Sequence, residues 1–270
     1  MIKGDVMQID LKGLRALVTG STAGIGEAIA ARLAQNGAEV VVNGRTAERV
    51  TKAIAALKTK APGARFHAAP GDVATRQGID AILAATGQVD ILVNNAGWFE
   101  PKDAFEITDE DWHKAFDLNV LSGVRLTRAL APHMRAKGFG RVVFISSESG
   151  LQIPTEMIHY GMSKTAQLSL TRGFAQALKQ TGVTVNAVLP GPTLSEGVGG
   201  FLENLARTEG KTVADIEKGF FEHARPTSLL KRFIDPEEFA NVVAFVCSRE
   251  ASAINGAPIR AEGGVVLSIA

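Results

Sequence analysis

The feature that most constrains the fold is an alternation of short apolar runs with stretches of helical periodicity. The runs are almost continuously apolar, which is typical of strands in a parallel sheet covered on both faces. With right-handed crossovers, this pattern predicts an α/β fold: a doubly wound parallel sheet of about seven strands with helices on both faces. We expect strands at 14–20, 38–44, 64–73, 89–97, 140–150, 183–191 and 257–264, and helices at 23–37, 47–60, 74–86, 108–138, 155–181 and 235–248.

The alternation continues to the end of the chain without a linker, repeat or low-complexity segment, so we expect one domain over 1–270. Asp235 is the predicted N-cap of the last helix, and Pro236 occupies its first turn. One long excursion, residues 192–234, interrupts the pattern and carries several aromatic side chains. Because ligands of such sheets bind at the carboxyl ends of the strands, we expect this excursion to cover the substrate.

Composition excludes several classes of protein. The formal net charge is +1 and no long basic run occurs, which argues against a nucleic-acid or anionic-membrane surface. The single cysteine, Cys247, has no intramolecular disulfide partner and is expected to be a small buried residue. The segment MIKGDVMQIDLKG lacks the pattern of a signal peptide, and no apolar run is long enough to span a membrane, so a cytoplasmic location is expected. The five histidines lack metal-ligand spacing, so no metal site is expected.

The segment TGSTAGIG (19–26) lies between the first predicted strand and the first predicted helix. Gly20 suits a tight turn, Gly24 leaves room for a pyrophosphate, and Gly26 lets the helix pack close to the strand. A helix N-terminus also presents free N–H groups and a positive dipole end to phosphate. A glycine-rich loop alone is often an ordinary turn, but this position between strand and helix favours dinucleotide binding.

Tyr160 is the only tyrosine in a chain with 13 phenylalanines, and Lys164 follows it by one helical turn. For an isolated pair of this kind, an amphipathic core residue and a solvated lysine would be the better interpretation. The tyrosine occurs, however, in a chain that also carries the glycine loop and, thirteen residues before it, Ser147. In that context the pair favours acid/base chemistry.

Three motifs together resemble the short-chain dehydrogenase/reductase family in its single-domain form, which is similar to the 3-oxoacyl carrier-protein reductases. They are T-G-x-x-x-G-x-G at Thr19–Gly26, N-N-A-G at Asn94–Gly97, and Y-x-x-x-K at Tyr160 and Lys164. They occur in the family's order and in register with the predicted strands, and the resemblance spans about 12–264. It implies a Rossmann-like oxidoreductase that interconverts a ketone or aldehyde and an alcohol with a nicotinamide cofactor.

The resemblance also implies the roles of individual residues. Tyr160 is the general acid/base, Ser147 binds the substrate oxygen, Lys164 supports Tyr160, and Asn119 completes the set by holding a water behind Lys164. Ser146 and Ser149 remain alternatives to Ser147. The residues implied to contact the cofactor are Gly20, Thr22, Ala23, Gly24, Ile25, Gly26, Arg45, Asp72, Val73, Asn94, Ala96, Gly97, Tyr160, Lys164, Pro190, Gly191, Thr193 and Ser195.

Carbonyl reduction needs a hydride at carbon and a proton at oxygen, and a phenol suits the proton step. Its ordinary pKa of about 10 is high for exchange near neutrality. A neighbouring cation lowers such a pKa, so we expect Lys164, on the same helix face, to lower the pKa of Tyr160.

The end of the second strand discriminates between NAD and NADP in such folds. Gly44 stands where NAD-preferring members of the family carry an aspartate, and Arg45 follows it. A guanidinium there pairs well with a 2′-phosphate, so we expect NADP(H) to be preferred, with NAD(H) possible. The alternative is that Arg45 stacks on adenine without selecting between the two.

The substrate is less constrained. The residues positioned to line its pocket are Trp98, Phe99, Glu148, Leu151, Gln152, Ile153, His159 and those of the cover at 194–225. Glu148 either recognises a polar or cationic substrate or pairs with a nearby basic residue. Glu262 replaces the family's usual aspartate before two glycines, and the resemblance implies a homotetramer or homodimer. The alternative function is a non-catalytic dinucleotide-binding sensor or scaffold on the same fold.

Overall fold

The computed structural model describes residues 8–269, excluding the side chains of residues 196 and 201. Its centre is a seven-stranded sheet in the order β3-β2-β1-β4-β5-β6-β7, and every neighbouring pair of strands is parallel. The predicted doubly wound sheet is therefore confirmed. The strands are β1 (Arg15–Val18), β2 (Glu39–Gly44), β3 (Phe66–Pro70), β4 (Ile91–Asn94), β5 (Gly140–Ile145), β6 (Val183–Pro190) and β7 (Pro258–Ala261).

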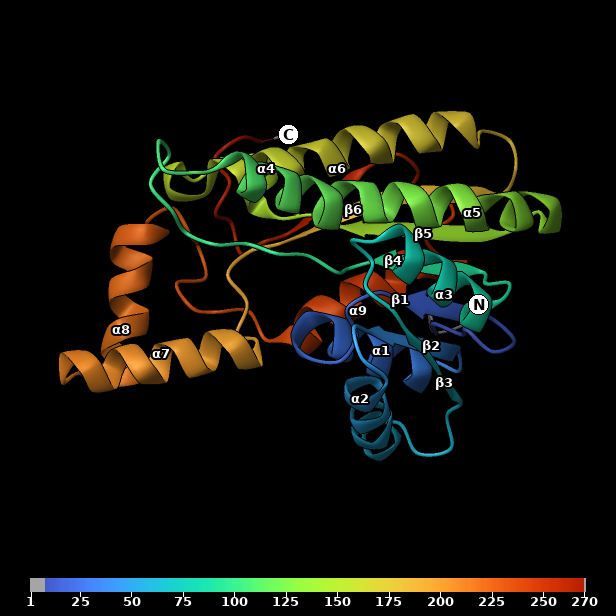
Figure 1. Ribbon diagram of the computed structural model, residues 1–270, viewed down its shortest axis with the longest axis horizontal. Coiled ribbons are helices and arrows are strands. Elements are labelled where there is room, and N and C mark those ends of the chain that lie inside the picture. Colours follow the sequence, from blue (N-terminus) through green and yellow to red (C-terminus); the bar gives the residue numbers. More distant parts are fainter. Residues whose placement is uncertain (1–7, 270) are drawn as a thin grey trace, which may run out of the picture.

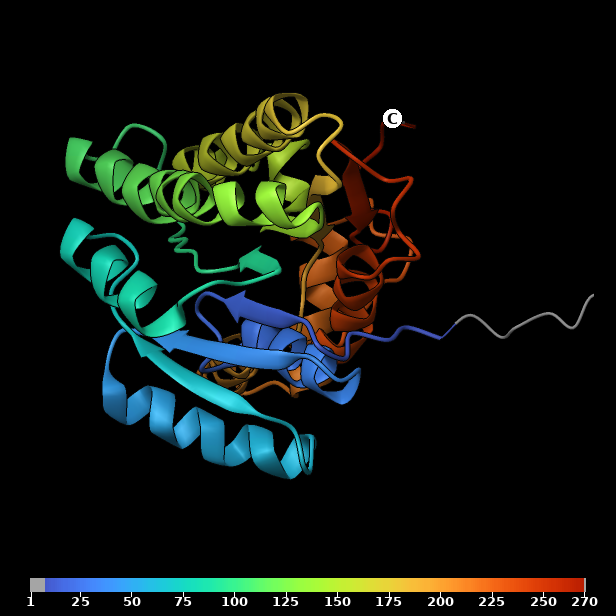
Figure 2. The same cartoon turned by 90° about the vertical axis from the view of Figure 1, so that its right-hand side faces the viewer.

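Helices cover both faces of the sheet, as Figures 1 and 2 show. One buried cluster joins the sheet to α1, α2 and α9, and a second joins the opposite face to α3, α5 and α6. In Figure 2, α2 and the pair α5 and α6 lie on opposite sides of the strands. The covering helices are α1 (Gly24–Gln35), α2 (Ala47–Lys60), α3 (Arg76–Thr86), α5 (Ser122–Lys137), α6 (Ile158–Ala177) and α9 (Pro236–Cys247).

Helix α2 shows how local sequence specifies these elements, and its bounds match the predicted 47–60. Thr46 caps its N-terminus by accepting a hydrogen bond from the backbone N–H of the third helical residue. Val50, Ala53 and Leu57 share one face and are buried against the sheet. The predicted cap of α9 is confirmed as well, because the Asp235 side chain forms a capping box at its start.

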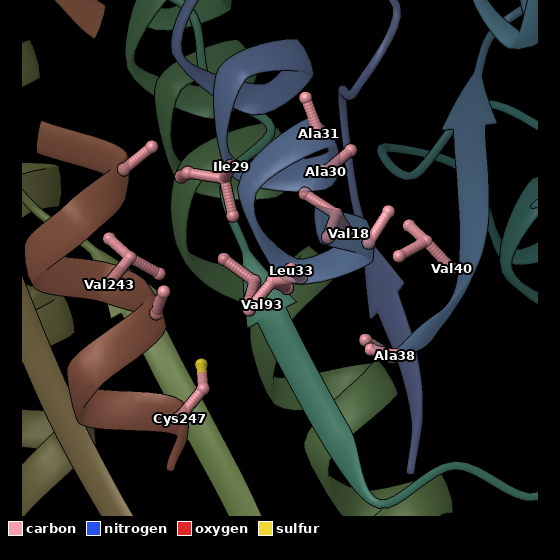
Figure 3. Close-up of a cluster of buried hydrophobic side chains, with 14 of the residues drawn as sticks. Val18, Ile29, Ala30, Ala31, Leu33, Ala38, Val40, Val93, Val243 and Cys247 are labelled. Atoms are coloured by element: carbon pink, nitrogen blue, oxygen red, sulfur yellow. The ribbon is translucent and has the colours of Figure 1, made fainter. Parts of the chain in front are cut away.

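The cluster beneath α1 and α9 forms the larger part of the core (Figure 3). Ile29 and Leu33 of α1 pack with Val93 of β4 and Val243 of α9. Cys247 is fully buried at the edge of this cluster, which confirms the prediction that it is a small buried residue. Burial of each large aliphatic side chain stabilises the fold by about 1.5–3 kcal/mol.

The predicted long helix over 108–138 is interrupted. Helix α4 (Asp109–Ala115) and α5 are separated by a π-helical turn, Phe116–Leu121, which contains Asn119. A π turn accommodates an additional residue in the helix and is often found at functional sites. Here it turns Asn119 into the interior, where that side chain is 1 % exposed. The predicted strand 140–150 ends at Ile145, because Glu148–Gly150 forms a 3₁₀ turn.

The excursion, residues 192–234, is helical: α7 (Glu196–Glu209), α8 (Val213–Gly219) and a π-helical turn, Phe220–Ala224. Its two ends meet, because Leu194 donates to the carbonyl of Ile234 at 2.9 Å and Ile234 donates to the carbonyl of Pro192 at 2.9 Å. In Figure 1, α7 and α8 stand apart from the sheet at the left. The excursion has a small buried cluster of its own, made of Leu202, Ala206, Ile216, Phe221 and Phe233.

The one-domain organisation over 1–270, with the excursion as a substrate cover, stays a prediction. No helix within residues 8–269 is both long and apolar enough to cross a membrane. Over the same residues, no three His, Cys, Asp or Glu side chains gather as metal ligands. The interpretation of the N-terminal segment concerns residues 1–7 in part, and these lie outside the described residues.

Candidate active site

The glycine loop leads from β1 into α1 at the carboxyl edge of the sheet. Strands β2 and β4 flank β1, so the chain reverses its direction of winding at this point, which is where such sheets bind nucleotides. Helix α1 begins after Ala23, whose methyl group offers no capping oxygen. The first N–H groups of α1 therefore depend on another partner, and an anion fits them well.

Two loop glycines are required by close approach. Gly20 has φ +62°, and a Cβ on it would lie 3.0 Å from the Cα of Ala96. A Cβ on Gly26 would lie 2.4 Å from the side-chain nitrogen of Asn95 and 2.4 Å from the carbonyl oxygen of Gly20. Any larger side chain at either position would push the loop away from the segment after β4.

That segment is hydrogen-bonded to the glycine loop. The Thr19 hydroxyl accepts from the backbone N–H groups of Asn95 and Ala96 at 2.9 and 3.0 Å. In return, the Asn95 amide donates to the carbonyls of Thr19 and Gly20 at 2.9 and 3.2 Å. Two motifs that lie far apart in the sequence thus form one rigid wall of the crevice.

Asn43 is a structural element of this site that the sequence analysis did not assign. Its buried side-chain oxygen accepts from the Gly20 N–H at 3.1 Å, and its nitrogen donates to the carbonyls of Ala69 and Gly71 at 2.9 and 3.2 Å. One amide therefore joins the glycine loop to the ends of β2 and β3. Its position at the end of β2, beside a glycine, was the available signal.

The predicted cofactor residues cluster around this crevice. Gly44 has no room for a side chain, since a Cβ there would lie 2.5 Å from the Thr22 methyl carbon. Arg45 is exposed and has no salt bridge within residues 8–269. A Cβ on Gly24 would lie 3.2 Å from the Cβ of Ser195, so the excursion begins beside the loop. Asp72 accepts from the Ala74 N–H at 2.9 Å, beside the buried Val73.

Further along the crevice, the end of β6 carries the remaining predicted contacts. Pro190 is the last residue of β6, and the Thr193 hydroxyl donates to the Gly191 carbonyl at 2.9 Å. A Cβ on Gly191 would lie 2.3 Å from the carbonyl oxygen of Glu262, so the loop after β6 packs on the C-terminal loop. These contacts hold the segment where it turns from the sheet into the excursion.

Ser147 and Tyr160 meet at the far side of the crevice. Tyr160 is half-buried on α6, and the Ser147 side chain lies near its phenol, where it acts to lower the pKa of Tyr160. The Ser147 hydroxyl accepts from the Ser149 N–H at 3.1 Å and donates to the Glu148 carboxylate. The Ser146 hydroxyl instead donates to the backbone carbonyl of Lys164. The Ser146 hydroxyl is therefore engaged away from the phenol, and the choice of Ser147 as the substrate-binding serine stays a prediction.

Lys164 lies behind the phenol, with its amine 5.4 Å from the centre of the Tyr160 ring. The amine donates to the carbonyl of Ile145, the last residue of β5, at 2.8 Å. Burial lowers the pKa of Lys164 to about 7, although the Glu148 carboxylate opposes this shift.

The predicted effect of Lys164 on Tyr160 is not what this structure shows. Burial raises the pKa of Tyr160 above its ordinary value and the Glu148 carboxylate raises it further, while the hydrogen bond from Ser147 and the Arg225 guanidinium lower it. The physical reason is common to both groups. The same apolar surroundings disfavour the charged form of each, so the phenol stays protonated and the ammonium loses its proton more readily.

Asn119 connects the π turn to the active-site helix. Its oxygen accepts from the Trp98 N–H at 2.7 Å, and its nitrogen donates to the Trp98 carbonyl and the Ser163 hydroxyl, both at 2.9 Å. The Ser163 hydroxyl donates to the Tyr160 carbonyl at 2.7 Å. All the polar atoms of the Asn119 side chain are thus engaged in fixing the crevice wall relative to α6.

Glu148 forms an ion pair with the excursion. The Arg225 guanidinium lies 3.0 Å from the Glu148 carboxylate and 3.4 Å from that of Glu156. The side chains of Arg225 and Glu148 are only 12 % and 7 % exposed, so the pair is shielded from solvent. The structure thus shows a basic partner for Glu148, one of the two interpretations left open. The role of Glu148 toward substrate stays a prediction.

The remaining predicted substrate residues differ in accessibility. His159 is fully buried between the rings of Trp98 and Trp112, and its nitrogens have no hydrogen-bond partner among the described residues. Burial lowers its pKa, so the imidazole is neutral near pH 7. Ile153 is exposed, and the ring centre of Phe99 lies 5.8 Å from that of Tyr160.

Comparison with known proteins agrees with this arrangement. The family model described as "short chain dehydrogenase" matches residues 15–205, which include the glycine loop, Tyr160 and Lys164. A Bacillus subtilis (strain 168) protein named "Uncharacterized oxidoreductase YvaG" is 48 % identical over 97 % of this chain and 100 % of its own length. The Homo sapiens protein "Dehydrogenase/reductase SDR family member 4" is 35 % identical over 92 % of this chain and 86 % of its own.

Among solved structures, L-sorbose reductase from Gluconobacter frateurii, complexed with NADPH and L-sorbose, superposes with a TM-score of 0.91. It is 32 % identical and covers 97 % of this chain and 100 % of its own. The family match and the sheet topology agree. The chain therefore belongs to the short-chain dehydrogenase/reductase family and is a dinucleotide-dependent oxidoreductase.

Proposed function

We propose that this protein interconverts a ketone or aldehyde and a secondary alcohol, with Tyr160 as general acid/base and NADP(H) as the preferred cofactor. The observation that carries the proposal is the meeting of the Ser147 and Tyr160 side chains, with Lys164 behind them, in the crevice that starts at the glycine loop. Two hydroxyl groups near each other match what a carbonyl oxygen needs: one donor to polarise it and one acid to protonate it. To act as that donor, the Ser147 hydroxyl would turn its one proton from the Glu148 carboxylate to the substrate oxygen.

The residues present fit a dinucleotide. The uncapped N-terminus of α1 would suit the pyrophosphate. The wall formed by Asn94–Gly97 would hold the ribose side, and the Lys164 amine lies close to Gly97 in that wall. When bound, the nicotinamide supplies the hydride chemistry. The protein then orients the substrate and manages the proton.

The direction of the Tyr160 shift favours reduction near neutral pH. A phenol with a raised pKa stays protonated there and is ready to donate to the oxygen that becomes the alcohol. Ser147 holds that oxygen in place. The reverse reaction needs the phenolate, so it requires a higher pH or another positive charge nearby.

The NADP(H) preference rests on the end of β2. Gly44 leaves no acidic side chain for a ribose hydroxyl, and the exposed Arg45 is available to a 2′-phosphate. The Gluconobacter relative was solved with NADPH. Arg45→Ala is expected to raise the KM for NADPH about tenfold or more and to leave that for NADH nearly unchanged, because one charged hydrogen-bond partner is lost. Equal losses with both cofactors would instead support stacking on adenine.

The Glu148–Arg225 ion pair would place a carboxylate and a guanidinium near Ser147, where the substrate is expected to bind. We propose that the substrate is a carbonyl compound that carries further hydroxyl groups, because such groups can donate to the carboxylate and accept from the guanidinium. The relative that was solved with L-sorbose supports this class. A screen of hydroxylated and purely apolar ketones, following the absorbance of the reduced nicotinamide, tests it. Faster turnover of the apolar set would contradict it.

Tyr160→Phe tests the reaction itself. The variant loses only the hydroxyl, so we expect it to fold and bind NADPH normally while kcat falls by roughly 10²–10⁴, the usual contribution of a general acid. Binding is measured by nicotinamide fluorescence and turnover by absorbance. If the variant retains the wild-type kcat, the assignment of Tyr160 is wrong. If the wild type binds NADPH but turns over no carbonyl substrate, the sensor or scaffold function is favoured.

A further inference from the structure

Gln167 lies between Lys164 and the π turn. It is 1 % exposed and sits on α6 three residues after the lysine, so both side chains emerge from the same helix face. Its side-chain nitrogen donates to the backbone carbonyl of Asn119 at 2.6 Å. Its side-chain oxygen lies 3.5 Å from the Lys164 amine, at the outer limit of a hydrogen bond. One amide thus bridges the lysine and the π turn.

The family resemblance implies that Asn119 holds a water behind Lys164. In the structure the backbone carbonyl of Asn119 accepts a hydrogen bond from the Gln167 amide. Because Asn119 lies in a π turn, where the helical hydrogen-bond pattern is shifted by one residue, its carbonyl accepts from a neighbouring helix.

We propose that Gln167 is a positioning residue, which holds the Lys164 amine between the Ile145 carbonyl and the crevice. The inference rests on the proposed function, because it assigns a task to Lys164. Gln167 has no contact with the reacting atoms in this arrangement. Its action is on the direction and the charge of the lysine.

The geometry explains how the direction is set. A lysine ammonium has three N–H donors. The Ile145 carbonyl accepts one at 2.8 Å, and the Gln167 oxygen is placed to accept a second. The third is then free to point toward Gly97, where an added Cβ would lie 3.5 Å from the Lys164 amine. Without Gln167, a buried donor would have no acceptor and the amine could swing away from the crevice.

The electrostatic surroundings make the charge of Lys164 sensitive to this contact. Glu148, from the 3₁₀ turn after β5, is the charged residue that acts on it, and Arg225 from the excursion offsets Glu148. The neighbours from β5 and the π turn, Ile145 and Asn119, are neutral. Because burial already brings the pKa of Lys164 to about 7, one acceptor more or less changes its protonation at neutral pH.

Three variants test the proposal. Gln167→Met keeps the length and removes both polar atoms, Gln167→Glu places a carboxylate beside the lysine, and Thr171→Val is the matched control. Thr171 is equally buried on the same helix and donates to the Gln167 carbonyl at 2.8 Å, so its loss costs a buried hydrogen bond without touching Lys164. Equal effects of Gln167→Met and Thr171→Val would mean a purely structural role.

The direct measurement is an NMR titration of the Lys164 side chain in protein labelled with ¹³C-lysine, assigned with Lys164→Arg. We expect the midpoint to fall by about one pH unit in Gln167→Met and to rise in Gln167→Glu, with no change in Thr171→Val. Unchanged midpoints in both Gln167 variants would overturn the proposal. The titration needs neither cofactor nor turnover, so its result stands even if Tyr160→Phe refutes the proposed function.

Kinetics supply the second measurement. In Gln167→Met, kcat for reduction is expected to fall about tenfold, while the KM of the carbonyl substrate stays within about threefold of the wild-type value. The reason is that the Lys164 amine is no longer held in position, whereas substrate binding is unaffected. The alkaline limb of kcat/KM for NADPH should move to lower pH by the same interval as the NMR midpoint. A loss of kcat without that movement of the alkaline limb would also count against the proposal.

Discussion

The sheet with its covering helices and the excursion are built differently. Around the sheet, two large buried clusters and a set of buried side-chain hydrogen bonds tie the glycine loop, the segment after β4 and α6 together. The excursion has a small cluster of its own, which includes Phe221 and Phe233. It joins the rest through its paired ends, through Arg225 and through hydrogen bonds to the C-terminal loop, where Leu229 and Leu230 donate to the Gly263 carbonyl and the Thr227 hydroxyl donates to the Val265 carbonyl. The comparison teaches that the proposed reacting groups are all held by the sheet and its helices, while Arg225 reaches Glu148 from the excursion.

The sheet unit and the excursion are therefore expected to affect different properties of the protein: the chemical step and the use of substrate. The residues proposed for the proton step lie at the sheet edge and on α6, where the main core holds them. Arg225, which pairs with Glu148, belongs to the excursion. Changes within the excursion are therefore expected to alter substrate use more than the chemistry or the global stability.

The largest contrast comes from truncating one phenylalanine in each unit. Phe239 of α9 and Phe221 of the excursion are 1 % and 2 % exposed. Phe239→Ala is expected to lower the free energy of unfolding by about 3–5 kcal/mol, because it opens a cavity in the main core. Phe221→Ala is expected to leave the global value nearly unchanged and to unfold the excursion locally, raising KM. Urea denaturation and limited proteolysis measure the two effects.

The control for this pair is NADPH binding, which should survive Phe221→Ala because the dinucleotide crevice lies mostly on the sheet. If both variants lower the global free energy of unfolding equally, the two units are one cooperative body and the contrast is broken.

An intermediate effect is expected at the contact between the units. Arg225→Met leaves Glu148 buried without its cation, so kcat/KM should fall by about 10–100-fold. It should also raise the pKa of Tyr160 further, since Arg225 lowers it. The double variant Glu148→Gln/Arg225→Met should recover part of the loss, because the unpaired carboxylate is gone. A double-mutant cycle compares kcat/KM of the wild type, the two single variants and the double variant. Strictly additive losses would show that Glu148 and Arg225 are not energetically coupled.

The smallest effect is a pH dependence that belongs to the sheet unit alone. Lys164 must be charged to act, so with a pKa of about 7 it loses this form as pH rises through 7, and kcat/KM for NADPH should fall about tenfold per unit above that. Tyr160 should show no phenolate absorbance until well above pH 10. Because it is the only tyrosine, the signal near 295 nm reports this residue. Phenolate formation near pH 7 would show that the pKa of Tyr160 is lowered and not raised, which would contradict this prediction.

Much of the fold follows from sequence periodicity, since β-strand and helix positions agree with the structure to within a few residues. The π turn at Phe116–Leu121 could not be predicted in this way, because it depends on Asn119 meeting Trp98 across the crevice. Because this contact is not visible in the local sequence, the apolar periodicity of 108–138 predicted one continuous helix. Tertiary contacts, and not local preference, decide that segment.

The candidate site shows the same limit. Ser147, Tyr160 and Lys164 lie together as their motifs predict, whereas the directions of their pKa shifts depend on burial that no motif reports. Arg225 is 77 residues from its partner Glu148, so pairing could not be inferred from spacing. The sequence does place a polar residue, Gln167, one turn beyond Lys164 on the same helix face. An amide at such a position is equally common on a protein surface, so its contact with Lys164 could not be predicted.

The bare start of α1 has a consequence for the lifetime of the protein. A helix that opens on Ala23 lacks a cap of its own, while α2 and α9 carry theirs. The dinucleotide's phosphates would complete that helix end, so the cofactor acts as a piece of the fold as well as a reagent. At a hundred times its Kd, such a ligand stabilises the native state by about 2.7 kcal/mol. Proteolytic turnover in a cell would then follow the nicotinamide pool, even when no substrate is present.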